Sequence, residues 1–168
     1  MSKLTPRIGC ALALALTMAC VPQTALADGV WDRLGGTDRY ETMSAIVSEG
    51  FSTASRAVVA TGQNFPDALT ASSLAGAMDA PVILTASDHL SDAARRELQE
   101  LNVREVIILG GEAAVSPVVE QEIAGMGITC GRIAGADRFD TALGTMRLTR
   151  EAGSTSNTVI IATMARKP

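Results

Sequence analysis

An aspartate followed directly by an arginine occurs twice in the same local context. Asp38-Arg39 returns as Asp137-Arg138, and each pair is preceded by a further arginine, Arg33 or Arg132. Aspartate in this setting can cap a helix, and the arginines can then pair with a neighbouring acid such as Asp67. Alternatively, the four guanidinium groups can bind an anionic polymer, because their planar forks suit carboxylates and phosphates. The residues alone leave both interpretations open.

Other side chains offer little acid–base, nucleophilic or metal chemistry. His89 is the only histidine, so neither a histidine-rich zinc site nor a Ser-His-Asp triad is easily assembled. Its neighbour Asp88 and the serine that follows favour a solvated loop. The run Gly110-Gly111 is not followed by the Lys-Ser/Thr of a phosphate-binding loop, and Gly125-Met126-Gly127 lacks the third glycine of a dinucleotide site. We therefore expect no cofactor, no metal and no enzymatic activity.

The N-terminal 27 residues have the three parts of a secretory signal peptide. Lys3 and Arg7 precede an apolar run at 8–21, and Ala25-Leu26-Ala27 provides a cleavage site. The run is shorter than the roughly 20 residues that span a bilayer, so we expect a secreted protein without a membrane span after cleavage. A single cysteine, Cys130, would remain and could form no intramolecular disulfide. The formal net charge of −4 argues against nucleic acid as a partner.

Short apolar runs alternate along the chain with segments that carry helix-start signals. The apolar runs are hydrophobic throughout, as in strands of a parallel sheet covered on both faces; they are residues 57–61, 82–85, 106–109, 128–133 and 159–162. The helix-start signals are Asp38, Pro66, Ser91, Ser116-Pro117 and Asp137. This alternation predicts an α/β fold with a mostly parallel, short-stranded sheet flanked by helices.

The duplication extends beyond the Asp-Arg pairs. Residues 33–42 return as residues 132–141, which is 99 positions later (132 − 33), and residues 58–61 return as residues 160–163. Repeated units of this kind bury their faces against one another and commonly build extended binding surfaces. Because little of the second copy follows its helix, we expect the apolar side chains of that helix and of the following strand to lack partners; they are Phe139, Leu143, Met146, Ile160 and Ile161.

Four segments in order resemble the signatures of the cell-wall-binding repeat type 2 family of Gram-positive surface proteins. They are residues 33–42 (RLGGTDRYET), 60–69 (ATGQNFPDAL), 80–85 (APVILT) and 106–116 (VIILGGEAAVS). The resemblance implies repeat units with a Rossmann-like layer and no cofactor, which bind an anionic cell-wall polymer and usually occur in threes. It divides the chain into a signal peptide (1–27), a first repeat (28–131) and an incomplete second repeat (132–168), as in a truncated gene or a fragment.

The leading hypothesis is a secreted module that anchors a surface protein non-covalently to an anionic wall polymer. Arg33, Arg39, Arg132 and Arg138 are the candidate polymer-binding residues, with Asp38, Asp67 and Asp137 in structural or accessory roles. One alternative is a wall-active hydrolase that uses Asp38 and Asp67, which would have to face one cleft about 5 to 10 Å apart. Another is a surface protein that associates with further repeats or with itself.

Overall fold

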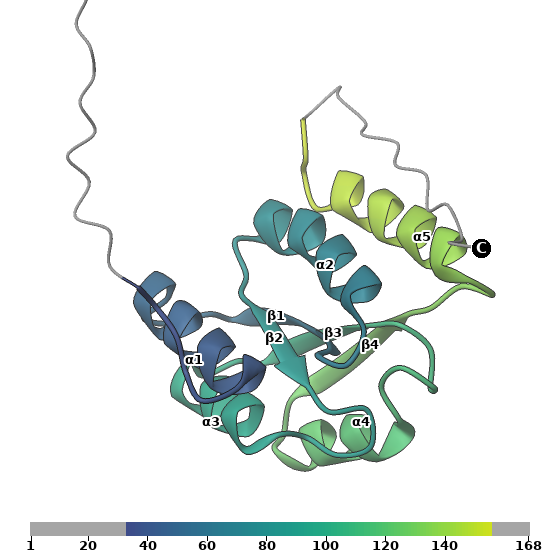
Figure 1. Ribbon diagram of the computed structural model, residues 1–168. Helices are drawn as coiled ribbons and strands as arrows, with labels where there is room; N and C mark the ends of the chain where they lie inside the picture. Colours follow the sequence, from purple (N-terminus) through teal and green to yellow (C-terminus); the bar gives the residue numbers. More distant parts are fainter. Residues whose placement is uncertain (1–32, 156–168) are drawn as a thin grey trace, which may run out of the picture. The chain divides into compact units, whose positions relative to one another are not determined.

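In the computed structural model, which describes residues 33–155, helices and strands alternate along the chain (Figure 1). The helices are α1 (Arg39–Gly50), α2 (Phe65–Met78), α3 (Asp92–Glu100), α4 (Pro117–Gly125) and α5 (Arg138–Glu151). The strands are β1 (Arg56–Thr61), β2 (Val82–Thr85), β3 (Glu105–Leu109) and β4 (Thr129–Ile133).

The four strands form one parallel sheet in the order β2-β1-β3-β4. Val58 lies beside Val82 of β2 on one side and beside Ile107 of β3 on the other. In the central strands β1 and β3 nearly every residue is buried, which explains their continuous hydrophobicity. The predicted α/β class, the parallel sheet and the four strands expected within residues 57–133 are confirmed.

Helices cover both faces of the sheet (Figure 1). On one face, strand side chains such as Val59 and Ile108 pack with residues of α1, α3 and α4. On the other face, Val58 and Leu109 pack with the α2 residues Ala71, Leu74 and Ala75. The core thus lies in two layers on either side of the sheet, and the small residues of α2 bring that helix close to β1.

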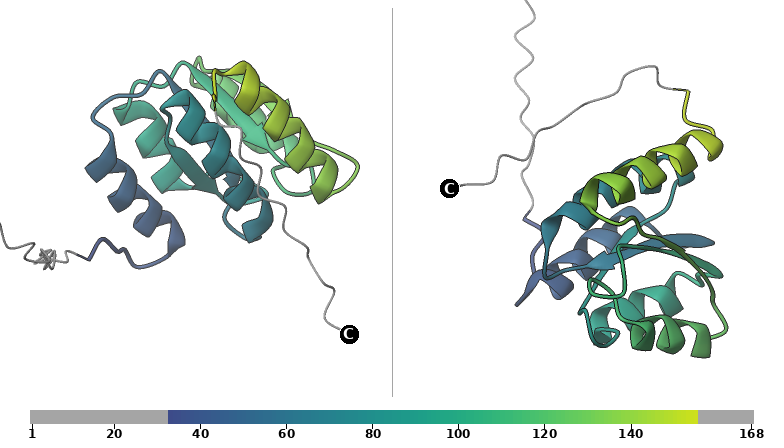
Figure 2. Two further views of the ribbon diagram at one scale, coloured as in Figure 1. Left: turned by 90° about the horizontal axis from the view of Figure 1, so that it is seen from above. Right: turned by 90° about the vertical axis from the view of Figure 1, so that its right-hand side faces the viewer.

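Helix α5, which begins at the second copy of the Asp-Arg motif, packs on the helix and sheet that precede it. It lies beside α2 on the same face of the sheet (Figure 2). Thr141 and Thr145 are buried on its inner side, and Leu148 packs against the core layer beneath α2. The opposite side carries Phe139, Leu143 and Met146, whose exposed fractions are 60%, 43% and 37%. The predicted shortage of partners is confirmed for these three residues, whereas Ile160 and Ile161 lie outside the described residues.

Strand β4 differs from the buried strand expected at residues 128–133. It starts at Thr129, lies at the edge of the sheet, and has an alternation of exposed and half-buried residues. Its only neighbour is β3, so its outer edge is not paired with another described strand. Within residues 33–155, no helix is long and apolar enough to cross a membrane.

Candidate binding site

The first copy of the repeated motif builds the start of α1. The Asp38 carboxylate accepts hydrogen bonds from the backbone N–H groups of Tyr40 and Glu41, both at 2.8 Å. The Thr42 hydroxyl donates to the Asp38 carbonyl at 2.7 Å and accepts from the Gly36 N–H at 3.0 Å. A side chain at Gly36 would place its Cβ 2.4 Å from that of Glu41, so only glycine fits. The predicted cap at Asp38 is confirmed.

The second copy repeats this geometry at the start of α5. The Asp137 carboxylate accepts from the N–H groups of Phe139 and Asp140 at 2.8 and 2.9 Å. The Thr141 hydroxyl again joins the aspartate carbonyl to a glycine N–H, that of Gly135. The shared glycine, aspartate and threonine are therefore a local capping device, and their spacing is explained by helix geometry without a ligand.

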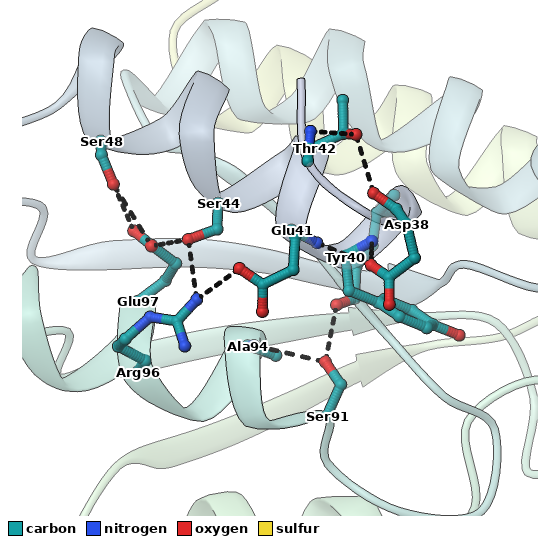
Figure 3. A network of polar contacts seen from close by, with 12 residues as sticks. Asp38, Tyr40, Glu41, Thr42, Ser44, Ser48, Ser91, Ala94, Arg96 and Glu97 are labelled. Carbon is teal, nitrogen blue, oxygen red and sulfur yellow. Dashed lines mark hydrogen bonds and ion pairs between the residues drawn. The ribbon is translucent and has the colours of Figure 1, made fainter. Parts of the chain in front are cut away.

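The Glu41 side chain does not return to the backbone of its own helix start. Its carboxylate accepts a hydrogen bond from Arg96 of α3 at 2.9 Å, and the same guanidinium also donates to Ser44 (Figure 3). Nearby, the buried carboxylate of Glu97 accepts hydrogen bonds from the hydroxyls of Ser44 and Ser48. This network fixes α1 against α3 and so sets the position of the motif at the start of α1.

The four candidate arginines occupy four different environments. Arg39 is exposed and donates a hydrogen bond to the carbonyl of Gly62, the residue directly after β1. The Arg39 side chain also borders an apolar groove of about 450 Å³ beside β2. Arg33 is exposed in a coil and has no hydrogen bond or ion pair to another residue between 33 and 155. Arg138 is exposed at the start of α5.

Arg132 is the exception, because its guanidinium is committed to internal contacts. It donates to the carbonyl oxygens of Gly110 and Val115, each at 2.9 Å, and forms an ion pair with Glu120 of α4 at 2.8 Å. Only 17% of its side chain is exposed. These contacts tie β4 to α4 and to the loop after β3, which favours the structural interpretation for this arginine.

A crevice of about 420 Å³ opens at the carboxyl ends of β1 and β3. The chain leaves these two adjacent strands toward opposite sides of the sheet, β1 leading to β2 and β3 leading to β4. Such a switch point is where ligands of open α/β sheets usually bind. The walls come from residues 64–67, from the pair Gly110 and Gly111, and from four residues of the second copy, Gly135, Asp137, Arg138 and Thr141.

Asp67 is the carboxylate that faces this crevice from the first copy. Burial raises the pKa of the Asp67 carboxyl, and the Arg138 guanidinium partly offsets that rise. Gly110 makes room for it: its φ of +107° suits glycine, and a Cβ there would lie 2.7 Å from the Asp67 Oδ2. Asp38 does not line the crevice, so the two carboxylates of the hydrolase hypothesis do not share it.

The predictions from the sequence gave the four arginines the same candidate roles and named neither Glu120 nor Glu97. The partner of Arg132 lies 12 residues earlier on another element, and no local spacing connects the two. For Glu97 a signal existed, because the residue falls on the stripe formed by Ala94, Leu98 and Leu101, all of which are buried. The exposed His89 pairs with Asp88, in agreement with the predicted solvated loop.

Comparison with known proteins shows similarity to one family and to proteins that contain related segments. Residues 33–120 match the family described as cell wall binding domain 2 (CWB2). The chain is 42% identical over 138 residues to the N-acetylmuramoyl-L-alanine amidase LytC of Bacillus subtilis (strain 168), a match that covers 82% of this chain and 27% of LytC. It is 30% identical over 110 residues to the amidase enhancer of the same organism, covering 66% of this chain and 16% of the enhancer.

Two solved structures share the fold. Cwp6 from Clostridium difficile superposes with a TM-score of 0.68 at 31% identity, over 71% of this chain and 19% of Cwp6. Cwp8 from the same organism superposes with a TM-score of 0.65 at 27% identity, over 68% of this chain and 21% of Cwp8. The chain thus spans about a quarter or less of the length of each of these relatives.

Proposed function

Because the chain belongs to the cell wall binding domain 2 (CWB2) family, we propose that it is a cell-wall-binding module that anchors a surface protein non-covalently to an anionic wall polymer. The observation that carries the proposal to particular residues is the crevice at the carboxyl ends of β1 and β3. Both copies of the repeated motif contribute to the surroundings of the loop at residues 62–67, Arg39 through the Gly62 carbonyl and Arg138 beside Asp67.

The proposal includes export and a repeat organisation. Residues 1–27 would direct secretion across the membrane of a Gram-positive cell and be removed. Residues 28–131 would then form the first repeat and residues 132–168 the beginning of a second, with the protein retained at the wall. Protein sequencing of the N-terminus of the exported protein would test the cleavage site, and cell fractionation would test the location.

A hydrolase is the less supported alternative. LytC is an amidase, but the match covers only 27% of that protein. The similarity therefore supports association with the wall, and it does not support catalysis by this chain. The Asp38 carboxylate is occupied by two backbone N–H groups at its own helix start. A wall-lysis assay with purified chain addresses this alternative directly: solubilisation of walls that is lost in Asp67→Asn would replace the binding proposal with a catalytic one.

Wall retention is the experiment for the leading proposal. Purified chain is mixed with isolated Bacillus subtilis walls and sedimented at increasing salt. We expect retention that weakens with salt, and weakens further in Arg39→Ala and Arg138→Ala, because screening reduces attraction between exposed charges. Arg147→Ala removes an exposed charge from the outer part of α5 and is the matched control. Equal retention of all variants would show that the repeated arginines are not part of the wall-binding surface.

A further inference from the structure

The two copies of the repeated motif contribute different groups to the switch-point crevice. In the first copy, Arg39 donates to the Gly62 carbonyl and therefore supports the loop from outside the crevice. In the second copy, Arg138 lines the crevice and lies close enough to Asp67 to affect its titration. The crevice is thus composite, with one wall from the loops of the first repeat and the other from the opening of the second.

Asp67 has unused capacity to accept hydrogen bonds. Between residues 33 and 155, its carboxylate has no hydrogen-bond or ion-pair partner, although it is partly buried against Gly110. An ionised carboxylate offers about four lone-pair sites. The Asp67 carboxylate can therefore accept hydrogen bonds from a ligand that supplies O–H or N–H donors.

The charges around the crevice disfavour an anionic group inside it. Its walls carry two carboxylates, Asp67 and Asp137, against the single guanidinium of Arg138. Asp137 is neutralised in part by the two N–H groups that it caps, whereas the Asp67 carboxylate accepts no hydrogen bond from a residue between 33 and 155. A phosphate or carboxylate placed here would approach Asp67 at close range, and like charges repel each other.

An aromatic ring lies at the same site. Phe65 lines the crevice and is 67% exposed, although a phenylalanine at the start of a helix gains nothing from contact with water. A carboxylate that accepts hydrogen bonds, an arginine that donates them and an exposed ring suit a sugar, which has hydroxyl groups at its edges and apolar C–H groups on its faces. The volume of about 420 Å³ lies within the usual range for small-ligand pockets.

We propose that this composite crevice is a subsite for one uncharged sugar residue of the wall polymer, stacked on Phe65 and hydrogen-bonded to Asp67 and Arg138. The anionic groups of the polymer then lie outside the crevice, nearer to exposed arginines such as Arg39. This inference rests on the proposed wall-binding function, and it assigns the sugar specificity of that binding to the crevice. It also makes the opening of the second copy, including α5, part of the binding site of the first.

Binding of wall oligosaccharides tests the subsite. Oligosaccharides released from isolated Bacillus subtilis walls are separated by anion exchange into neutral and anionic fractions, and each is titrated into isotopically labelled full chain. We expect the neutral fraction to shift the backbone amide resonances of residues 64–67, 110–111 and 135–141. Asp67→Asn should weaken that binding by at least about tenfold, because hydrogen bonds to a charged group are lost. Phe65→Ala should weaken it as well.

Arg147→Ala is the matched control, since it removes an exposed charge from α5 outside the crevice. It should leave binding of the neutral fraction within about twofold. Shifts at these amides caused only by the anionic fraction, the absence of shifts with either fraction, or unchanged binding by Asp67→Asn would each overturn the subsite. Failure of the unaltered chain to sediment with walls would instead overturn the proposed function, so the two failures are distinguishable.

Discussion

At the scale of the residue, duplication has placed the same side chain in two environments. Arg132 joins β4 to α4 through Glu120 and two carbonyl oxygens, whereas Arg33, at the equivalent position of the first copy, is exposed in a coil. Comparing Arg132 with Arg33 therefore separates the effect of the sequence motif from the effect of its structural surroundings. The same residue of the repeated motif thus has a structural role in one copy and is exposed to solvent in the other.

We therefore predict that Arg132→Ala and Arg33→Ala differ in stability. Arg132→Ala leaves Glu120 and two carbonyl groups without their donor and should lower the free energy of unfolding by about 1.5–3 kcal/mol. Arg33→Ala should change it by less than about 0.5 kcal/mol, as at ordinary surface positions. Urea denaturation followed by circular dichroism measures both, and equal losses would contradict the assignment of roles.

Asp67 gives a prediction about pH. Burial raises the pKa of its carboxyl above the ordinary value of 3.8, so the folded state holds this proton more tightly than the unfolded state does. The favourable contribution of the protonated form is complete below the unfolded pKa and is lost as pH rises through the folded pKa. Asp67→Asn should therefore be more stable than the unaltered chain at pH 7, with the advantage shrinking toward pH 3. Denaturation at both pH values measures this, and an advantage that grows in acid would refute it.

At the scale of the element, α1 is fixed to α3 by a buried carboxylate with hydroxyl donors. Glu97 is 1% exposed and accepts from Ser44, which also receives a hydrogen bond from Arg96. The equivalent of Ser44 in the second copy is Leu143 (44 + 99), so α5 lacks the group that would satisfy Glu97. The polar network therefore distinguishes the first-copy helix from the second-copy helix as a partner for α3.

The expected consequence is that Ser44→Ala destabilises the fold by about 1–3 kcal/mol, because it removes a donor from a buried carboxylate. Ser48→Ala provides the comparison on the same helix, since its hydroxyl lies 3.3 Å from Glu97 and is partly exposed; its effect should be smaller. Thermal unfolding of the two variants gives the order. A larger effect at Ser48 would mean that the network depends on a different donor.

At the scale of the whole molecule, one side of α5 is packed against the fold and the opposite side is exposed to solvent. Its inner side packs beside α2, while Phe139, Leu143 and Met146 form an exposed apolar stripe. The equivalent positions in α1, which are Tyr40, Ser44 and Val47, face α3 and β2 in the first copy. The stripe is thus the side that α1 uses to cover its own sheet.

This exposed stripe predicts self-association of the chain, because apolar patches of this kind are buried when a partner is available. Sedimentation velocity at rising concentration should show oligomers that Leu143→Lys reduces. Leu69→Lys is the matched control, since Leu69 is a leucine of α2 with an exposed fraction of 65%. A chain that stays monomeric at all concentrations, or an equal effect of both substitutions, would contradict a role for the stripe.

The sequence alone was sufficient for several features that depend on near neighbours. The caps at Asp38 and Asp137 involve partners two to four residues away, and strands β1, β2 and β3 are visible as continuous apolar runs, so both follow from local geometry. The parallel sheet followed as well, because strands buried on both faces and separated by helices have few other arrangements. The motifs that carry the family resemblance are equally local, and the match at residues 33–120 bears them out.

Only the tertiary structure decided which repeated residues have which contacts. Parallel pairing of β3 with β4 places Arg132 against Gly110, Val115 and Glu120, and no spacing in the sequence encodes that meeting. The packing of α5 beside α2 likewise places Arg138 near Asp67, 71 residues earlier (138 − 67), and so completes the crevice. Identical motifs acquire different roles because side-chain contacts depend on what the sheet and helices bring together, and the two copies have different neighbours.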